Sequence, residues 1–277
     1  PQHHTTARRQ RQDVYKRQTL RSAGNLTLQG YSYAASGSGR GVDLNNDVIA
    51  ASGTVSMSGQ HNTGATYAIS LSGSTSITAG TGVTLESLNN NTGTIALLSS
   101  GGIDGGSGTV LMRAANYAFG GADRTITTTG VLTIEPDADE NSFASSFDNQ
   151  YLNPVSVTGL TLGKSSNASA ITLSRAISLS GPVSIYGGSI DVNANITANS
   201  GNILLDADTG STLNQSSTGI LLDDAITIET VTSGNLTLIG RSGDTGSGFD
   251  GIDASSANTT TLRSAGNLTL QGYSYAA

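Results

Sequence analysis

Carboxylates in glycine-rich turns are the side chains of this chain best suited to chemistry. The stretch Ser242–Asp253, SGDTGSGFDGID, contains Asp244, Asp250 and Asp253. Oxygen-rich turns of this kind suit Ca²⁺, which is bound by several oxygen ligands. The stretch lacks the regular GGxGxDxUx spacing that stacks calcium ions along a β-roll. The sequence therefore predicts no resident metal, and these three aspartates are kept as candidates for calcium only.

Two close pairs of aspartates suggest another chemistry, the cleavage of polysaccharides by paired acids. The pairs are Asp206 with Asp208 and Asp223 with Asp224. Lyases and hydrolases of that kind also need Lys or Arg near the acids, to hold uronates and stabilise charge. The chain has no basic residue between Arg175 and Arg241, so solvated turn acids are the better interpretation. We predict that the chain is not an enzyme, with a polysaccharide-cleaving β-helix as the alternative.

Nucleophilic and histidine chemistry has little support. There is no cysteine, and no Gly-x-Ser-x-Gly motif marks an activated serine. His61 is the only histidine beyond the first eighteen residues, so a triad or a zinc site would depend on it alone. A solvated turn histidine in GQHNTG is the better interpretation. We predict no catalytic residue and no cofactor other than the calcium considered above.

One segment departs in composition from the rest of the chain. Residues 137–154, DADENSFASSFDNQYLNP, contain Phe143 and Phe147, half of the 4 phenylalanines, with Asp148 and Tyr151. Functional loops on repeat scaffolds are found in such insertions. We expect an extruded loop whose ligand-binding residues are Phe143, Phe147, Asp148 and Tyr151. The alternative is that the two phenylalanines only pin the loop to the structure beneath it.

Internal repetition is the feature that must position these residues. Thr19–Ala35, TLRSAGNLTLQGYSYAA, returns unchanged as Thr261–Ala277, 242 positions later. A smaller unit inside it, GNLTLQG, recurs as GNLTLIG at Gly234–Gly240. Self-similarity of this kind is the signature of a repeat architecture. Each unit is a glycine turn followed by alternating apolar and small polar residues, which predicts a short half-buried strand.

Such strands are expected along the whole chain. Their expected buried pairs include Leu26/Leu28, Val55/Met57, Val83/Leu85, Val110/Met112, Val155/Val157, Ile203/Leu205 and Leu268/Leu270. The clearest alternation is Ile190–Ala198, IDVNANITA, which predicts one continuous strand face. No stretch has a helical period, and Gly, Ser, Thr and Asn are poor helix formers.

Irregular strand spacing, a near absence of Asn-Gly hairpin turns and a repeated small unit favour a parallel β-helix. Coils of about 20–25 residues with two or three strands each would bury one continuous column of Leu, Ile and Val. We predict an all-β parallel β-helix whose coils occupy residues 19–136 and 155–277, interrupted by the loop at 137–154. The matching ends predict a fragment of a longer repeat array.

Composition and charge agree with this fold and exclude several classes of partner. The chain has 36 glycines, 36% hydrophobic residues and 12% charged residues, which suits many tight turns around an aliphatic core. The formal net charge is −7, and residues 19–277 contain 8 basic and 19 acidic residues. An acidic body disfavours nucleic acid and anionic lipid. No apolar run approaches the roughly 20 residues of a membrane helix, so we predict no membrane insertion.

The first eighteen residues, PQHHTTARRQRQDVYKRQ, share no pattern with the rest of the chain. DVYKRQ resembles a translation of the mosaic end used in transposase-made sequencing libraries, and RRQRQ resembles the adapter bases upstream of it. Residues 8–18 therefore resemble a translated sequencing adapter, and we interpret residues 1–18 as a non-native leader to be excluded from fold reasoning. A basic arm that binds nucleic acid or a membrane surface is the alternative.

Several stretches resemble one known family. They are the GNLTLxG units, GVLTIEPDADENSF (130–143), GLTLGKSSNASAITL (159–173) and GPVSIYGGSIDVNANITANSGNILLDA (181–207). They resemble the repeat region of filamentous-haemagglutinin-type large bacterial exoproteins, which are secreted adhesins. The resemblance implies a right-handed parallel β-helix, a location outside the cell or on its surface, and adhesion to cells, matrix or glycans. The implied partners are surface glycans or proteins of a host or neighbouring cell, and neighbouring repeats of the same chain.

Overall fold

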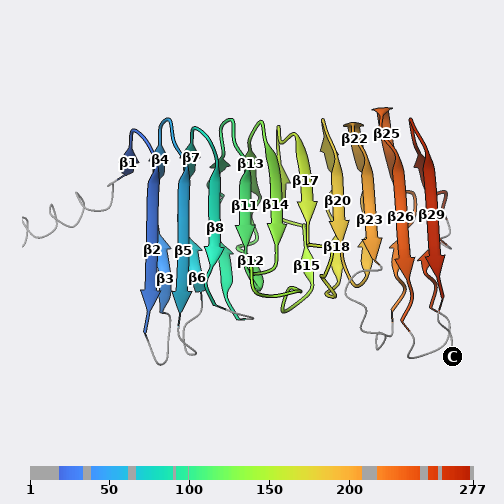
Figure 1. The fold of residues 1–277 in the computed structure, drawn as a ribbon, viewed down its shortest axis with the longest axis horizontal. Coiled ribbons are helices and arrows are strands. Elements are labelled where there is room, and N and C mark those ends of the chain that lie inside the picture. Colours follow the sequence, from blue (N-terminus) through green and yellow to red (C-terminus); the bar gives the residue numbers. More distant parts are fainter. Residues whose placement is uncertain are drawn as a thin grey trace, which may run out of the picture.

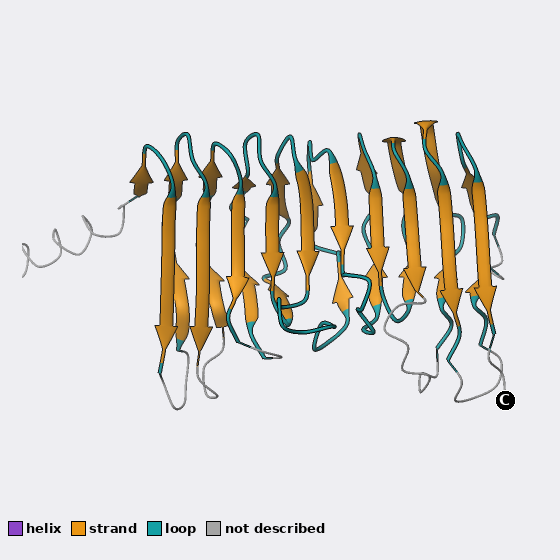
Figure 2. Ribbon diagram, viewed as in Figure 1, coloured by secondary structure: helices purple, strands orange, loops and turns teal. Residues whose placement is uncertain are grey.

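The computed structural model describes residues 19–33, 39–61, 67–89, 92–98, 100–207, 217–243, 249–254 and 258–274. Within these ranges the secondary structure consists of 29 strands and no helix (Figure 2). Accordingly, no helix there is long and apolar enough to cross a membrane. The prediction of an all-β fold is confirmed. Residues 1–18, Asp208 and Asp244 lie outside the described part of the chain.

One sheet, which we call the long sheet, runs along the whole stack (Figure 1). Its strands, in spatial order, are β2 (Leu26–Ser32), β5 (Val55–His61), β8 (Val83–Ser87), β11 (Val110–Arg113), β14 (Val131–Glu135), β17 (Gly159–Leu162), β20 (Val183–Tyr186), β23 (Ile203–Ala207), β26 (Leu236–Arg241) and β29 (Leu268–Tyr273). All neighbours are parallel, and each is the third strand along from the one before. The chain therefore returns to this face once per coil, which confirms the predicted parallel β-helix.

The face that precedes the long sheet in each coil is divided between two sheets, and we call it the first face. Its first six strands are β1 (Leu20–Ser22), β4 (Val48–Ala50), β7 (Ile77–Ala79), β10 (Ile103–Asp104), β13 (Arg124–Thr127) and β16 (Leu152–Pro154). The remaining four are β19 (Ile177–Leu179), β22 (Ile196–Ser200), β25 (Thr227–Ser233) and β28 (Thr261–Arg263). The ladder is interrupted between β16 and β19.

The face that comes after the long sheet, the third face, is divided in the same way. Its first sheet contains β3 (Arg40–Leu44), β6 (Tyr67–Leu71), β9 (Thr94–Leu97) and β12 (Asn116–Phe119). Its second contains β15 (Phe147–Asp148), β18 (Ile171–Leu173), β21 (Ile190–Val192), β24 (Ile220–Leu222) and β27 (Ile252–Asp253). The ladder is interrupted between β12 and β15, so each coil has up to three strands, as predicted.

The core is a column of stacked apolar side chains. In the long sheet Leu85 pairs with Met57 on one side and Met112 on the other, and all three are fully buried. Successive side chains of a strand point to opposite faces, so the residues two positions apart both enter the interior. Pairs of this type were predicted and are confirmed inside the stack. At its last strand Leu268 and Leu270 are exposed.

Coil length varies more than the sequence predicts. Val183 and Ile203 hold equivalent positions in adjacent coils 20 residues apart, whereas Ile203 and Leu236 are 33 residues apart. The prediction of about 20–25 residues is therefore wrong for the longer coils. The strands of the long sheet stay in register because each coil, whatever its length, places its apolar pair opposite the pair of the coil before it.

Two local predictions are wrong. Val155 is 42% exposed and only Val157, at 1%, enters the core. Between them Ser156 has a φ of 61°, which turns the chain out of the extended conformation. The stretch Ile190–Ala198 is not one strand but contributes β21 and β22 to two different sheets, with a bend between them.

Residues 137–154 are part of the stack rather than an extruded loop. They contribute β15 to the third face and β16 to the first face. β16 ends at Pro154, which has no N–H to give to a ladder, and the left-handed Ser156 comes soon after it. This explains why the ladder of the first face stops there. On the third face, the long connection from β14 to β15 takes the place of a strand that would continue from β12.

Candidate functional site

A hollow of about 210 Å³ lies at the interruption of the third face, and we call it the junction hollow. Its lining residues are Ala115, Asn116, Tyr117, Phe119, Phe143, Ser145, Ser146, Phe147, Asp148, Gln150 and Tyr151. They come from β12 and the residue before it on one side, and from the 137–154 segment on the other. All four residues predicted as ligand-binding are among them. The structure therefore brings the predicted set together around one hollow.

Hydrogen bonds hold the segment between two coils. The Ala144 N–H donates to the Ala115 carbonyl over 2.8 Å, and the Ser145 hydroxyl donates to Asn116 Oδ1 over 2.7 Å. On the side of the next coil, the N–H of Phe143 donates to Oδ1 of the buried Asn167 over 3.2 Å. These contacts fix residues 137–154 to the coil before and to the coil after, so the segment is held in the stack.

Four aromatic rings fill the space that the missing strand leaves. Tyr117 and Phe119 occupy the ladder positions that Ile95 and Leu97 hold one coil earlier. Their rings meet Phe147 edge to face, with centroids 5.6 and 6.3 Å away. Rings can span the break where aliphatic side chains are too short, because aromatic pairs interact well at such separations.

Phe143 and Phe147 are core residues of this cluster. Their rings stack with centroids 5.6 Å apart and planes 25° apart, and each residue is only 4% exposed. Tyr117 also contacts Phe143, at 5.9 Å and 81°. This arrangement agrees with the alternative given from the sequence, that the two phenylalanines pin the segment to the structure beneath it. They close the bottom of the junction hollow and offer little area to a ligand.

The rim of the junction hollow is polar. Asp148, Gln150 and Ser146 are exposed, and Tyr151 is half-buried. Asp148 Oδ1 accepts from the Gln150 N–H over 2.9 Å, and its Oδ2 accepts from the Ser174 hydroxyl over 3.1 Å. The carboxylate is thereby held in one orientation at the edge of the hollow.

Sequence reasoning missed Asn116, Tyr117, Phe119 and Gln150. The first three stand in β12, and their NYAF sequence is like that of many other short strands. β12 is also distant from the segment along the chain, since Phe119 precedes Phe147 by 28 residues. The aromatic pair at alternate positions was a signal, but nothing local shows that β12 is the last strand of its sheet. Gln150 carries no signal of its own.

A buried carboxyl group lies in the same segment. Asp137 is 3% exposed, and neither of its carboxylate oxygens has a hydrogen-bond partner of normal geometry in the described structure. Burial raises the pKa of Asp137 to about 7, Glu140 and Glu86 add to the rise, and the Ala115 backbone and Lys164 oppose it. A carboxyl group in this position is neutral over much of the acidic range.

Tyr117, the neighbouring aromatic residue of β12, is held by its hydroxyl. That hydroxyl donates to the Glu135 carbonyl over 3.0 Å. Burial raises the pKa of Tyr117 well above its ordinary value, and the charges of Asp137 and Glu135 raise it further. The phenol therefore stays protonated, and its role is to anchor the ring at the edge of the hollow.

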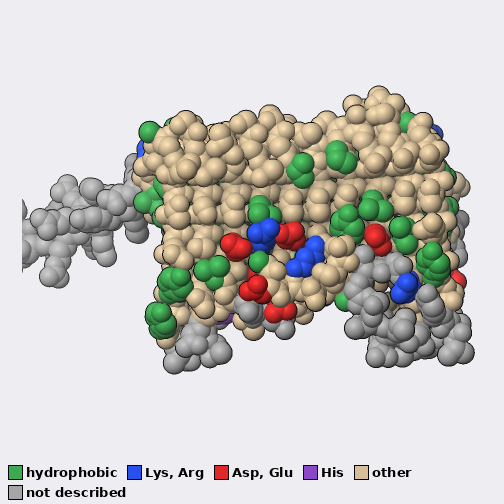
Figure 3. Space-filling view, in the orientation of Figure 1, with side chains coloured by type: hydrophobic (Ala, Val, Ile, Leu, Met, Phe, Trp, Pro, Cys, Tyr) green, Lys and Arg blue, Asp and Glu red, His purple; other side chains and the backbone are tan. Residues whose placement is uncertain are grey.

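Charged side chains gather over the middle coils in Figure 3, where most of the remaining visible face is uncharged. Glu86, Arg113 and Glu135 stand at one position of three adjacent long-sheet strands. Arg113 Nε lies 2.5 Å from Glu135 Oε1, and its Nη1 lies 3.7 Å from Glu86 Oε1. Glu135 raises the pKa of Arg113. The single Arg113 is shared between two carboxylates, so the cluster ties three strands of the long sheet together and leaves no cation free for a ligand.

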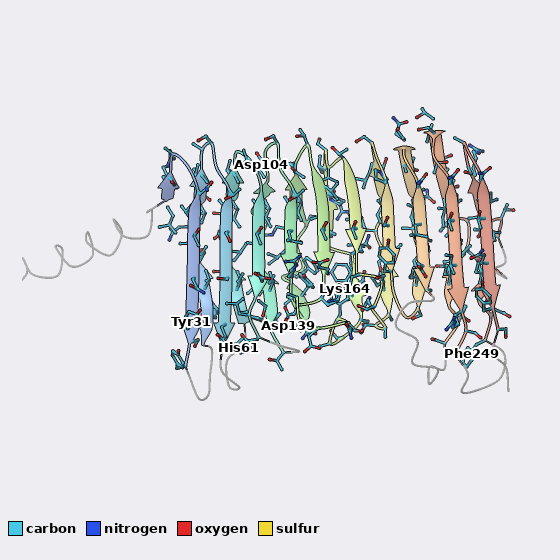
Figure 4. The ribbon with its side chains drawn as sticks, in the orientation of Figure 1. Tyr31, His61, Asp104, Asp139, Lys164 and Phe249 are labelled. Carbon is cyan, nitrogen blue, oxygen red and sulfur yellow. The ribbon has the colours of Figure 1, made fainter. Side chains whose placement is uncertain are left out.

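Lys164 joins the segment to the next coil. Its Nζ donates to the Asp137 carbonyl over 3.2 Å. Figure 4 labels it over the middle coils, with the exposed Asp139 of the segment nearby. Asp104 is labelled at the opposite edge of the stack in this view, so it lies apart from the junction hollow.

The calcium candidates are only partly described. Asp250 is exposed, and Asp253 is half-buried in β27. Over the described ranges, no three His, Cys, Asp or Glu side chains are grouped closely enough to hold a metal ion. Calcium binding by these aspartates stays a prediction, and thermal melts with calcium and with chelator would test it.

The paired acids and the histidine form hydrogen bonds within the stack. Asp223 Oδ1 accepts from the Asp224 N–H over 2.8 Å, and Asp224 Oδ2 accepts from Asn258 Nδ2 of the next coil over 3.0 Å. Asp206 lies in β23. His61 is buried at the end of β5, where its N–H donates to Asn89 Oδ1 over 2.6 Å, so the interpretation as a solvated turn residue is wrong.

No family model, no curated protein and no solved structure matches this chain. The resemblance to filamentous-haemagglutinin-type repeats stays a prediction from the residues quoted for it.

Proposed function

We propose that this chain is a structural and adhesive stalk segment of a secreted or surface-displayed bacterial protein. The observation that supports the adhesive part is the junction hollow, around which all four residues selected from the sequence as a ligand surface are gathered. The resemblance to filamentous-haemagglutinin-type exoproteins points to the same function. The ligand would be a glycan or a protein on the surface of a host or neighbouring cell.

The stack supports the role of a stalk. Ten strands of the long sheet, at the usual inter-strand spacing, span about 45 Å. Each coil is hydrogen-bonded to the coils on either side through parallel ladders, and the interior is a continuous apolar column. The stability of such an array is a sum of interfaces between neighbouring coils, so the stack can be lengthened coil by coil, as a stalk requires.

The hollow supports weak binding that gains strength by repetition. Its volume of about 210 Å³ accommodates only a small part of a surface molecule. A contact of this size holds a cell only when several copies act together, since linked sites turn later binding events into intramolecular ones. Neighbouring repeats displayed on one surface would supply such copies.

Retention of the labelled full chain on cells tests the proposal. We expect at least fivefold lower retention for the double variant Tyr151→Ala with Asp148→Asn, which changes the rim and leaves Phe143 and Phe147 in place. The matched control is Tyr31→Ala, an exposed aromatic residue at the N-terminal end of the stack (Figure 4), and it should retain as the wild type does. Equal retention of all three proteins would show that the junction hollow is not the adhesive surface.

A further inference from the structure

The junction hollow combines an apolar wall with a polar rim. The wall consists of the rings of Tyr117 and Phe119, both half-buried, above the buried Phe143 and Phe147. The rim consists of amide, hydroxyl and carboxylate groups of the other lining residues. A site of this kind fits a molecule that has one apolar face and several hydroxyl groups, because apolar walls with a few placed polar groups define small-molecule sites.

Several rim groups are available to a ligand. The side-chain amide of Gln150 and the hydroxyls of Ser146 and Tyr151 have no hydrogen-bond partner within the described ranges, although all three residues line the hollow. Asn116 accepts from Ser145 through Oδ1, which leaves its NH₂ group for a further acceptor. An amide donates and accepts, and a hydroxyl can do both. Ligand hydroxyls can therefore replace water here without leaving a buried polar group unsatisfied.

We propose that the junction hollow binds a single neutral pyranose ring of a surface glycan. The C–H face of the sugar packs on the rings of Tyr117 and Phe119, and its hydroxyls exchange hydrogen bonds with Gln150, Tyr151 and Asn116. This assignment rests on the proposed adhesive function and names the ligand class of the same site.

The size of the hollow selects one ring rather than a longer oligosaccharide. Its volume of about 210 Å³ is below the range of roughly 300–1,000 Å³ usual for drug-sized ligands. A hexose has about twelve non-hydrogen atoms, so a ligand of ordinary efficiency would bind with a Kd in the millimolar range. Affinity of this order agrees with a site that works by repetition.

Charge selects a neutral sugar over a uronate or a sulfated one. No basic side chain is among the described residues that line the hollow. The nearby Arg175 is engaged, since its Nη1 lies 2.5 Å from Asp123 Oδ1. Asp148 stands at the rim, and residues 19–277 carry 19 acidic against 8 basic residues. An anionic sugar would meet repulsion without a compensating cation.

Saturation-transfer NMR and titration on the full chain test the assignment. The probes are the methyl glycosides of glucose, galactose and N-acetylglucosamine, with methyl glucuronide as the anionic counterpart. We expect transfer to the ring C–H protons of at least one neutral glycoside, with at least fivefold weaker binding of the glucuronide. Gln150→Ala and Tyr151→Ala should each raise the Kd at least fivefold, whereas Tyr31→Ala should not. Absence of neutral-sugar binding, binding unchanged in both hollow variants, or equal binding of the glucuronide would overturn the assignment.

Chemical treatment of the cells separates this assignment from the adhesive proposal. Mild periodate destroys the vicinal diols of sugars, whereas protease removes surface proteins. Retention lost after periodate supports the sugar assignment. Retention that survives periodate but is lost after protease overturns the sugar assignment and leaves the adhesive function standing with a protein ligand. No retention on any untreated cell contradicts the adhesive proposal itself.

Discussion

The long sheet continues through ten strands without a break, whereas the third face is divided between β12 and β15. In the long sheet every coil returns an apolar pair to the same rung, as Leu85 does between Met57 and Met112. On the third face the coil after β12 inserts the 137–154 segment instead of a strand. The gap is then filled by rings rather than by a ladder.

This difference shows where a repeat scaffold can acquire a site. A continuous ladder uses its backbone groups and its inward side chains for the next coil, and only its outward side chains remain for a ligand. An interrupted ladder has side chains of two coils and one insertion meeting at the same place, as Tyr117, Phe147 and Gln150 do. Three predictions test whether the two regions really differ in this way.

The largest expected effect is that of Phe147→Ala. The ring is buried and contacts Tyr117, Phe119 and Phe143, so its removal leaves a cavity that the docked segment cannot easily close. We expect the free energy of unfolding to fall by about 3–5 kcal/mol. Denaturant unfolding measures it, and a loss below about 1 kcal/mol would show that the rings do not hold the break together.

A matched change in the long sheet sharpens the comparison. Leu85→Ala should lower the free energy of unfolding by about 2–5 kcal/mol. The loss should come from packing within the long sheet and not from packing of the 137–154 segment. Hydrogen exchange should therefore rise at the Ala144 amide, which donates to the Ala115 carbonyl, in Phe147→Ala and not in Leu85→Ala. The same exchange pattern in both variants would contradict the distinction between the two regions.

The second prediction concerns the pH dependence that Asp137 gives to the docked segment. Its pKa rises from the ordinary value of 3.8 to about 7 because the carboxyl is buried, so the folded state favours the neutral form. Its stabilising contribution is complete below pH 3.8, declines as the pH rises towards 7, and is lost above that. A shift of this size corresponds to about 4 kcal/mol at most.

Asp137→Asn isolates this effect, because other carboxyl groups also titrate. The neutral amide should remove the loss of stability that the wild type shows as the pH rises, and it should make the variant more stable than the wild type at pH 8. Glu86 and Glu140 face Asp137 with like charge and Lys164 with opposite charge, and all three remain in the variant. The exposed neighbour serves as control, since Asp139→Asn should keep the decline. A constant difference between wild type and Asp137→Asn from pH 4 to 8 would refute the prediction.

The smallest of the three effects is that of Asn149→Ala. Asn149 is buried, its Nδ2 donates to the Arg175 carbonyl over 2.9 Å, and its Oδ1 accepts from the Arg175 N–H over 2.9 Å. The side chain thus joins the coil of β15 to that of β18, just before the first face is interrupted between β16 and β19. We expect a loss of about 1–3 kcal/mol, because two backbone groups of Arg175 lose their partner.

The control for Asn149→Ala is Asn153→Ala, a half-buried residue of β16 whose side chain has no hydrogen bond within the described residues. It should change the free energy of unfolding by less than about 0.5 kcal/mol. Equal losses in the two variants, measured by denaturant unfolding, would mean that the amide bridge does not stabilise the stack where the first face is interrupted.

Much of the fold could be predicted from the sequence. Alternation at two-residue spacing places pairs such as Val83 and Leu85 inside, and this holds where the strand stays extended and has a coil on either side. It fails at Val155, because the left-handed Ser156 changes direction, and at Ile190–Ala198, because a corner divides the pattern between two sheets. Corners depend on how a coil closes, and alternation alone contains no information about that.

The candidate site could be predicted only in part. Phe143, Phe147, Asp148 and Tyr151 stand out because aromatic and acidic residues are concentrated in residues 137–154. Composition could not show that the two phenylalanines are buried while Asp148 and Tyr151 reach the rim. Exposure depends on the neighbours that a side chain meets in the next coil.

The sequence by itself determined that this chain forms short parallel strands around an aliphatic column, and that residues 137–154 are where the repeat is disturbed. Only the tertiary structure decided that this segment is docked in the stack. It also decided that Tyr117 and Phe119 pack on the segment, and that a polar rim surrounds the junction hollow. The physical reason is distance along the chain. Strand alternation acts over two residues, whereas the ladder of the long sheet joins residues 20 to 33 positions apart. The coil lengths that set this pairing result from closure and packing.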